Sequence, residues 1–447
     1  MSGSTLILVA LAGIFLLLFL VIRTKLHAFV ALLLVSLLVG IATGMPLNGV
    51  IESMQTGMGG TLGFVAVVVG LGAMFGQMLE VSGGAERLAQ TLIKKFGEDK
   101  AQWALGFTGF LVAIPVFFDV GFIILVPIVY GLAKKTGRSL LYYGIPLLAG
   151  LAVTHSFIPP TPGPIAVADL IGADLGWVIL FGTLAGIPSM IIAGPLFAKY
   201  ISKKIHVTVP DYMNIEEREE NRDLPSFGLI ASIILVPLVL ILLNTISGVV
   251  LPEGNGLRTV FTFLGHPFVA LIIATLLVFY FLGTKRGYSR QDVQVIANKA
   301  LEPAGIIILV TGAGGVFKQV LIDSGVGKVL GDMMAASPLP PIVLAFLIAS
   351  IVRVAQGSAT VAMVTAAGLI SPLITTLGLE GPILGLIVIS IAAGATIASH
   401  VNDSGFWLVN RYFGLDVKDT LRSWTVMETL ISLVGFIVVF VISLFIM

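Results

Sequence analysis

The chain has no cysteine and very little charge. None of its 447 residues is Cys, only 11% are Asp, Glu, Lys or Arg, and the net charge is +1. The missing cysteines exclude disulfides and thiolate metal sites, and the small net charge argues against nucleic-acid binding, which needs a clustered basic face. By contrast, 57% of the residues are hydrophobic and the mean hydropathy is +1.07. This composition predicts an all-α polytopic membrane protein, because a soluble chain could not cover so much apolar surface.

The motifs of common enzyme and cofactor sites are also missing. The sequence contains no phosphate-binding loop, no metal-binding helix motif and no nucleophile elbow. We therefore expect no metal, no cofactor and no enzymatic activity. An intramembrane enzyme stays as an alternative, which product formation in detergent without any membrane gradient would support.

The two halves of the sequence resemble each other. The segment that begins at His27 recurs at His266, the segment 70–83 recurs at 312–325, and His155 has a counterpart in His400. The three matches occur in the same order and are each about 240 residues apart, as in repeat architectures. They predict a first repeat over 1–201, a hydrophilic linker over 202–226 and a second repeat over 227–447.

Each predicted repeat contains apolar stretches long enough to cross a bilayer and two stretches that polar residues and prolines interrupt. An uninterrupted span needs about 20 residues. The uninterrupted stretches are 6–22, 29–43, 59–79, 177–198, 229–250, 267–283, 305–321 and 426–446. The interrupted stretches are 102–134, broken at 115–119; 140–171, broken at 155–164; 341–376, broken at 356–360; and 383–409, broken near His400.

The distribution of basic residues predicts the topology. If the first interrupted stretch of each repeat is a re-entrant helical hairpin, each repeat crosses the membrane an odd number of times, and the two repeats are inverted. With both termini outside, 21 of the 25 Lys and Arg residues then lie on the inner side, as the positive-inside rule requires. The linker 202–226 lies inside in this arrangement.

The break of the second hairpin combines several polar groups. Gly357 permits a tight turn, and Ser358 can cap the following helix, whose N-terminus suits a carboxylate. Gln356 and Thr360 lie beside them, and Arg353 lies about one turn earlier. An Arg at this depth needs a counter-charge. It could bind a substrate carboxylate, or form a structural pair with Asp119, with Asp403 or with a lipid phosphate.

The first repeat offers two further candidates. Asp119 lies at the break of the first hairpin, where burial can make a carboxyl group a proton carrier, or where it could merely cap a helix. The segment 155–164 contains four prolines and cannot be a continuous helix. The hydroxyls of Ser156 and Thr161, together with His155 and freed carbonyls, could hold a cation or sugar hydroxyls. A mere proline kink would leave the same pattern.

The last break is the densest polar cluster. His400, Asn402, Asp403 and Ser404 fall within five residues of an apolar run. Asn402 can recognise hydroxyls through its donors and its acceptor, whereas Asp403 and His400 could relay protons. We expect the breaks of both repeats to meet around a small polar anion, as in transporters built from broken helices. Asp119, Asp403 or His400 would then carry a coupled proton.

Several of these segments resemble one transporter family. The segments 57–63, 117–122, 155–164, 357–362 and 399–407 are similar to those of the gluconate permease family of proton symporters, within the ion transporter superfamily. The resemblance covers nearly the whole chain. It implies an elevator-type mechanism, a homodimer in the bacterial inner membrane, and import of gluconate or a related sugar acid with protons. Family members often have Glu at the position of Asp119 and His at that of Thr161. A sodium-coupled carboxylate symporter is the main rival.

Overall fold

The chain folds almost entirely into helices. The computed structural model describes residues 3–210, 224–326, 328–329, 332 and 339–446, and within them it contains no strand. Eight of the helices in these residues are long and apolar enough to cross a membrane. The predicted all-α, multi-pass membrane architecture is therefore confirmed.

The helices before the linker reproduce the predicted order of spans and breaks. They are α1 (Gly3–Ile22), α2 (Ala28–Ala42), α3 (Leu47–Val81), α4 (Gly84–Phe96), α5 (Ala101–Val112), α6 (Phe118–Thr136), α7 (Leu140–Phe157), α8 (Pro162–Ile171), α9 (Leu175–Ile191) and α10 (Phe197–Lys204). A π-helical turn, Ile192–Leu196, joins α9 to α10. Helix α10 extends into the predicted linker, of which residues 211–223 lie outside the described part of the chain.

The helices after the linker follow a similar order. They are α11 (Phe227–Val250), α12 (Gly256–Leu264), α13 (Pro267–Val278), α14 (Arg290–Asp323), α16 (Pro341–Gln356), α17 (Ala359–Leu377), α18 (Pro382–Gly394), α19 (Ser404–Phe413), α20 (Val417–Thr420) and α21 (Val426–Ile446). A π-helical turn, Leu421–Thr425, leads into α21. His27 and His266 cap α2 and α13 in the same way, since the Nδ1 atom of each accepts a hydrogen bond from the amide two residues later.

Two helices are much longer than the apolar stretches predicted. Helix α3 begins at Leu47 rather than at 59, and α14 begins at Arg290 rather than at 305. The extensions contain charged residues such as Glu52 and Glu302, which are exposed in the structure. Hydropathy ended the predicted spans at these charges, but a helix continues through polar residues when they face outwards.

The hairpin breaks lie where the sequence placed them. The first hairpin consists of α5 and α6, joined by residues 113–117, and the second consists of α16 and α17, joined at Gly357 and Ser358. Gly357 has φ +91°, a left-handed conformation that side chains with a Cβ rarely adopt. The broken helices are α7 with α8, and α18 with α19, and the latter pair is separated by residues 395–403.

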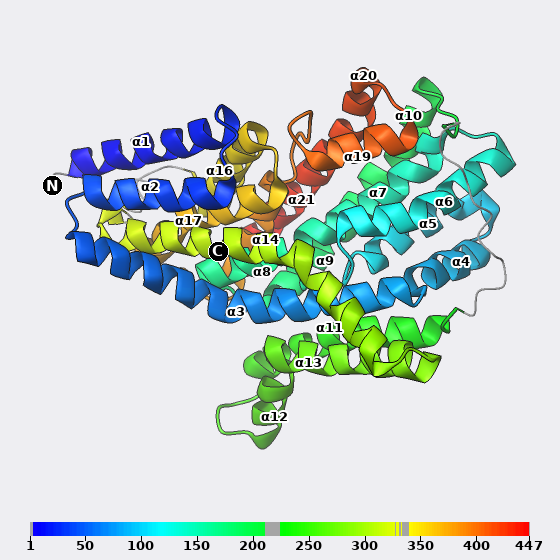
Figure 1. Ribbon diagram of the computed structural model, residues 1–447, viewed down its shortest axis with the longest axis horizontal. Coiled ribbons are helices and arrows are strands. Elements are labelled where there is room, and N and C mark those ends of the chain that lie inside the picture. Colours follow the sequence, from blue (N-terminus) through cyan, green and yellow to red (C-terminus); the bar gives the residue numbers. More distant parts are fainter. Residues whose placement is uncertain (1–2, 211–223, 327, 330–331, 333–338, 447) are drawn as a thin grey trace.

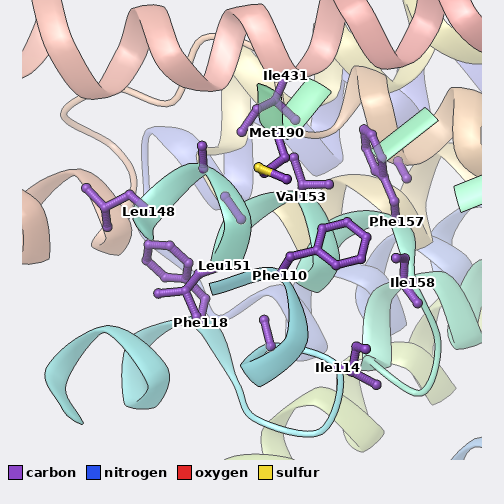
Figure 2. Close-up of a cluster of buried hydrophobic side chains, with 14 of the residues drawn as sticks. Phe110, Ile114, Phe118, Leu148, Leu151, Val153, Phe157, Ile158, Met190 and Ile431 are labelled. Atoms are coloured by element: carbon purple, nitrogen blue, oxygen red, sulfur yellow. The ribbon is translucent and has the colours of Figure 1, made fainter. Parts of the chain in front are cut away.

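The first hairpin packs tightly against α7 through glycines and large apolar side chains. A Cβ at Gly150 in α7 would lie 2.1 Å from the carbonyl oxygen of Gly106, and a Cβ at Gly109 in α5 would lie 2.4 Å from that of Leu147, so the close approach of the two backbones requires glycine at 150 and 109. Figure 2 shows Phe110, Phe157 and Met190 in the apolar cluster that joins α5, α7 and α9. This core holds the two breaks of the first half in fixed positions.

The basic ends of several helices gather at one end of the molecule. Figure 1 shows α10, α20 and the far ends of α4 and α6 at the end opposite the N-terminus. Residues 206–208, 210, 413–416 and 419 line a common pocket there, and the Leu140 amide donates to the Val207 carbonyl over 2.8 Å. These elements carry lysines that the topology prediction assigns to the inner side.

We expect single cysteines to report this topology on the cysteine-free background. A cysteine at Lys204, in α10, should react with a membrane-impermeant thiol reagent only after the cells are opened, because the positive-inside rule places this end in the cytoplasm. A cysteine at Glu253, between α11 and α12, should react in intact cells. Both side chains are exposed. Labelling of the Lys204 position in intact cells would refute the orientation.

Candidate functional site

Side chains from the break between α18 and α19 form hydrogen bonds to the last turn of α16. A helix leaves its last carbonyl groups without intrahelical partners. At the end of α16, the Val354 carbonyl oxygen accepts a hydrogen bond of 3.0 Å from Asn402 Nδ2 and lies 3.2 Å from His400 Nε2. The two breaks of the second half are therefore joined at one backbone oxygen.

An ion pair joins the same two breaks. Arg353 Nη2 lies 2.6 Å from Asp403 Oδ2, and the two side chains are only 3% and 14% exposed. The other contacts of Asp403 are local, with a hydrogen bond of 2.5 Å from Ser399 Oγ and one of 3.2 Å from the Gly405 amide at the start of α19. Of the two aspartates that the sequence offered to Arg353, Asp119 and Asp403, the structure pairs it with Asp403.

The break also contacts the beginning of α21. Trp424 Nε1 donates to Ser399 Oγ over 2.7 Å, Thr425 donates to the Ser399 carbonyl, and the Ala398 amide donates to Thr429 Oγ1 over 3.3 Å. These contacts satisfy polar groups that the broken helix exposes, which is necessary at a depth where water is scarce.

The tip of the second hairpin lies directly against Asn402. A Cβ at Gly357 would lie 2.3 Å from the Asn402 carbonyl oxygen, so the contact requires glycine. Ser358 caps α17 as predicted, because its Oγ accepts from the Val361 amide over 3.4 Å. The amides of Ala359 and Thr360, in the first turn of α17, have no intrahelical acceptor and can donate to an anion.

The breaks of the first half reach the same region. The ring of Phe117, at the first hairpin, meets the ring of His155 edge-on with centroids 6.4 Å apart. Phe118 packs against Trp424 at 5.4 Å, and Trp424 bonds the last break. Helix α8 packs along α17, where a Cβ at Gly163 would lie 2.6 Å from Met363 Sδ. The two breaks of the first half therefore contact each other and lie against segments that adjoin the breaks of the second half. That the four breaks surround a substrate stays a prediction.

Several polar atoms at or beside the breaks are buried without a hydrogen-bond partner among the described residues. Buried polar groups normally have partners, so such atoms indicate a place for a polar ligand. They include atoms on both halves of the chain, namely Thr154 Oγ1, His155 Nδ1, Arg353 Nε and Nη1, Gln356 Oε1 and Asn402 Oδ1.

The remaining predicted residues occupy varied positions. Asp119 is exposed at the start of α6 and makes no cap, so the capping alternative is wrong; the cap position is Phe117. Thr161 is buried and donates to the Ile158 carbonyl over 2.6 Å. Ser156 is buried in α7, Thr360 is half-buried, and Ser404 is exposed at the start of α19.

The sequence analysis missed one ionisable residue of this region. Glu428 is 4% exposed, and its charge interacts with those of Arg353 and Asp403. It lies near the start of an apolar helix, where an acidic residue is common because it favours the helix dipole. The signal available was that no other residue of α21 is charged.

We expect the Arg353–Asp403 pair to be essential to stability. Removing one partner of a buried ion pair costs about 3–5 kcal/mol, because the other charge is left unpaired. Arg353→Met and Asp403→Ala should each lower the melting temperature in detergent strongly, and the double variant should lose less than the sum of the two. Arg290→Met, at an exposed Arg, is the matched control. Additive losses would show that the pair does not act as a unit.

Comparisons with known proteins agree with this architecture. Residues 5–445 match the family described as GntP family permease. The chain is 45% identical to the low-affinity gluconate transporter of Escherichia coli K12, with 98% of each chain covered. It is 42% identical to a gluconate permease of Pseudomonas aeruginosa, again with 98% of each covered, and 41% identical to the Gnt-II system L-idonate transporter of E. coli K12, with 98% and 99% covered.

A solved structure shares the fold. The YdaH transporter of Alcanivorax borkumensis superimposes with a TM-score of 0.63 over 92% of this chain and 96% of that one, at 16% identity. The family match spans nearly the whole chain, and the relatives exceed 40% identity over the same length. The chain is thus a member of the GntP permease family.

Proposed function

We propose that this protein is a secondary active transporter that imports gluconate, or a closely related sugar acid, together with protons across the bacterial inner membrane. Relatives named as gluconate and L-idonate transporters support the substrate class. The observation that carries the proposal is the group of unpartnered buried polar atoms at or beside the helix breaks. A group of unpartnered polar atoms at breaks between apolar helices suits a small polar solute rather than a lipid.

The carboxylate of the substrate binds between Arg353 and the start of α17. Arg353 uses Nη2 for Asp403, and its Nε and Nη1 atoms have no partner in the described chain. Each of these N–H groups can donate a charge-assisted hydrogen bond to a substrate carboxylate. The amides of Ala359 and Thr360 add the positive end of a helix dipole.

The hydroxyl groups of the substrate meet the remaining polar atoms. Asn402 Oδ1 and Gln356 Oε1 are acceptors on the second half, and His155 and Thr154 lie on the first. Ser156, Thr161, Ser358 and Ser404 complete the proposed binding set. A site shared between both halves lets a movement of one part expose the substrate to either side of the membrane.

Proton coupling follows from the charge of the substrate. Gluconate is an anion at neutral pH, and bringing one negative charge inwards against 100 mV costs about 2.3 kcal/mol. One proton per anion cancels this cost, and more than one drives accumulation. Asp119, Asp403 and His400 are the candidate carriers. Asp403 is held by Arg353, so Asp119, which has no ion pair among the described residues, is the better of the two carboxylates.

The wider architecture is part of the same proposal. The order of two hairpins and two broken helices suits two inverted repeats, 1–201 and 227–447, with the linker 202–226 between them and both termini outside. The fold shared with YdaH is compatible with elevator-type movement in a homodimer. Cross-linking of single cysteines within and between protomers would test both features.

Uptake into proteoliposomes tests the function. The purified protein should accumulate labelled gluconate under an inward proton gradient, and unlabelled sugar acids should compete according to their similarity to gluconate. An inward sodium gradient without a pH gradient should drive nothing. Sodium-driven uptake would favour a sodium-coupled carboxylate symporter, and the absence of any sugar-acid transport would refute the proposal.

We expect Ser358→Ala and Asn402→Ala to weaken gluconate binding by roughly five- to 150-fold, because losing one partner of a buried polar contact costs ~1–3 kcal/mol. Isothermal titration in detergent measures the change. Ser350→Ala is the control, since Ser350 lies on the same hairpin but bonds only the Phe346 carbonyl of its own helix. Near-normal affinity of both site variants would place the substrate elsewhere.

We expect neutralisation of the proton carrier to separate exchange from accumulation. Asp119→Asn should abolish pH-driven accumulation, whereas exchange of labelled for unlabelled gluconate without a gradient continues. Asp403→Asn and His400→Gln test the other two carriers in the same assay. If all three variants accumulate gluconate as well as the unaltered protein, the coupled proton is carried by another group.

A further inference from the structure

Glu428 is a buried acid with an oxygen that has no hydrogen-bond partner among the described residues. Its side chain is 4% exposed, and its Oε1 atom accepts no hydrogen bond from any described residue. One turn further along α21, the Ser432 Oγ atom is also buried without a partner. Burial disfavours an ionised carboxylate whose oxygens are not all hydrogen-bonded, so a carboxyl group at this position can bind a proton.

The packing of α16 and α21 brings Glu428 to the level of Arg353. The rings of Phe346 and Phe436 stack with centroids 4.1 Å apart. Arg353 lies seven residues beyond Phe346, and Glu428 lies eight residues before Phe436, which is about two turns in each case. Arg353 and Glu428 both lie on the side of this ring pair that faces the break at 395–403. Arg353 pairs with Asp403 of this break, and Thr429, next to Glu428, accepts a hydrogen bond from the Ala398 amide.

Few other charges surround Glu428. Helices α9 and α18, which pack along α21, contain no ionisable residue, and α16 contributes only Arg353. The break at 395–403 contributes Asp403 and His400, α7 contributes His155, Tyr142 and Tyr143, and the π-helical turn 421–425 contributes the exposed Arg422. Arg353 and Asp403 are the groups whose charges act on Glu428. The three form a buried cluster of one cation and two acids.

We propose that Glu428 is a proton-binding residue that controls the availability of Arg353 to the substrate carboxylate. When Glu428 is neutral, the unpartnered Nε and Nη1 atoms of Arg353 can bind the substrate. When Glu428 is ionised, it attracts these same donors and repels the incoming anion. Glu428 is a positioning residue, because it acts on the substrate through Arg353.

The charges of the cluster favour one proton at Glu428 with each bound substrate anion, in addition to the proton proposed for Asp119. Arg353, Asp403 and ionised Glu428 sum to a charge of −1, and a bound carboxylate would bring the sum to −2 in a medium of low dielectric constant. One proton taken from the outer solution by the Glu428 carboxylate keeps the sum at −1. The same proton leaves to the inner solution with the substrate, and no other bond changes.

This inference rests on the proposed gluconate transport, and its test is the pH dependence of gluconate binding to the full chain in detergent. For the unaltered protein, affinity should fall by about tenfold per pH unit above the transition, as one linked proton requires. Glu428→Gln should bind gluconate independently of pH in this range. At alkaline pH it should therefore bind more tightly than the unaltered protein, whereas a merely structural defect would weaken binding at every pH.

Two further variants sharpen the result. Glu428→Asp keeps an ionisable group and should retain the pH dependence with a displaced midpoint. Ser432 is buried one turn further along α21, and Ser432→Ala should behave like the unaltered protein. The proposal is overturned if Glu428→Gln keeps the normal pH profile, if it binds less tightly at all pH values, or if folded Glu428→Asp binds independently of pH.

A measurement without substrate separates this inference from the function on which it rests. Infrared difference spectra between acid and alkaline pH should show a protonated-carboxyl band that is lost in Glu428→Gln. If the unaltered protein binds no gluconate, the proposed function fails, and loss of this band in the variant still supports Glu428 as a proton site. A band that is unchanged in the variant contradicts the inference even if gluconate is transported.

Discussion

The carbonyl oxygen of Val354 must find donors outside its own helix, and much of the site depends on how it does so. Helix α16 ends at Gln356, so the carbonyl groups of its last turn have no partners within the helix. Asn402 and His400 lie against that oxygen. The contact fixes the break of one helix against the tip of another, and it requires glycine at 357 because the Asn402 backbone fills the space of a side chain. Once these segments are joined, Arg353 and Asp403 are brought into their ion pair.

The site is polar because its helices are broken, and the breaks survive because they bond one another. Ser399 receives a hydrogen bond from Trp424 and gives one to Asp403, so one serine links the last break both to α21 and to the ion pair. The atoms left over, on Arg353, Gln356 and Asn402, are those a ligand can use. Polar groups that bond one another thus hold the breaks rigidly, and polar atoms without a partner can bind a ligand. This is the preorganisation that a selective site needs.

The charged cluster makes the site sensitive to the binding of a single proton or anion. A cation flanked by two acids is nearly balanced, and one proton or one substrate anion changes its sum substantially in a medium of low dielectric constant. Asp403 already bonds Arg353, whereas Glu428 has an unpartnered oxygen beside them. The two acids therefore differ in environment, and groups whose environments differ in this way can serve different roles in one cycle.

The sequence by itself determined the class of the protein, the order of its spans and the places where helices break, because hydropathy, glycine and proline act locally. It also identified Arg353, Asn402 and Asp403 as candidates, since polar residues stand out in apolar runs. It misplaced the starts of α3 and α14, because a charge facing outwards does not end a helix. Only the tertiary structure decided that Arg353 pairs with Asp403, that Asp119 caps nothing and that Glu428 belongs to the cluster. The ion pair joins residues 50 positions apart on different helices, and a local pattern carries no information on which helices will lie side by side.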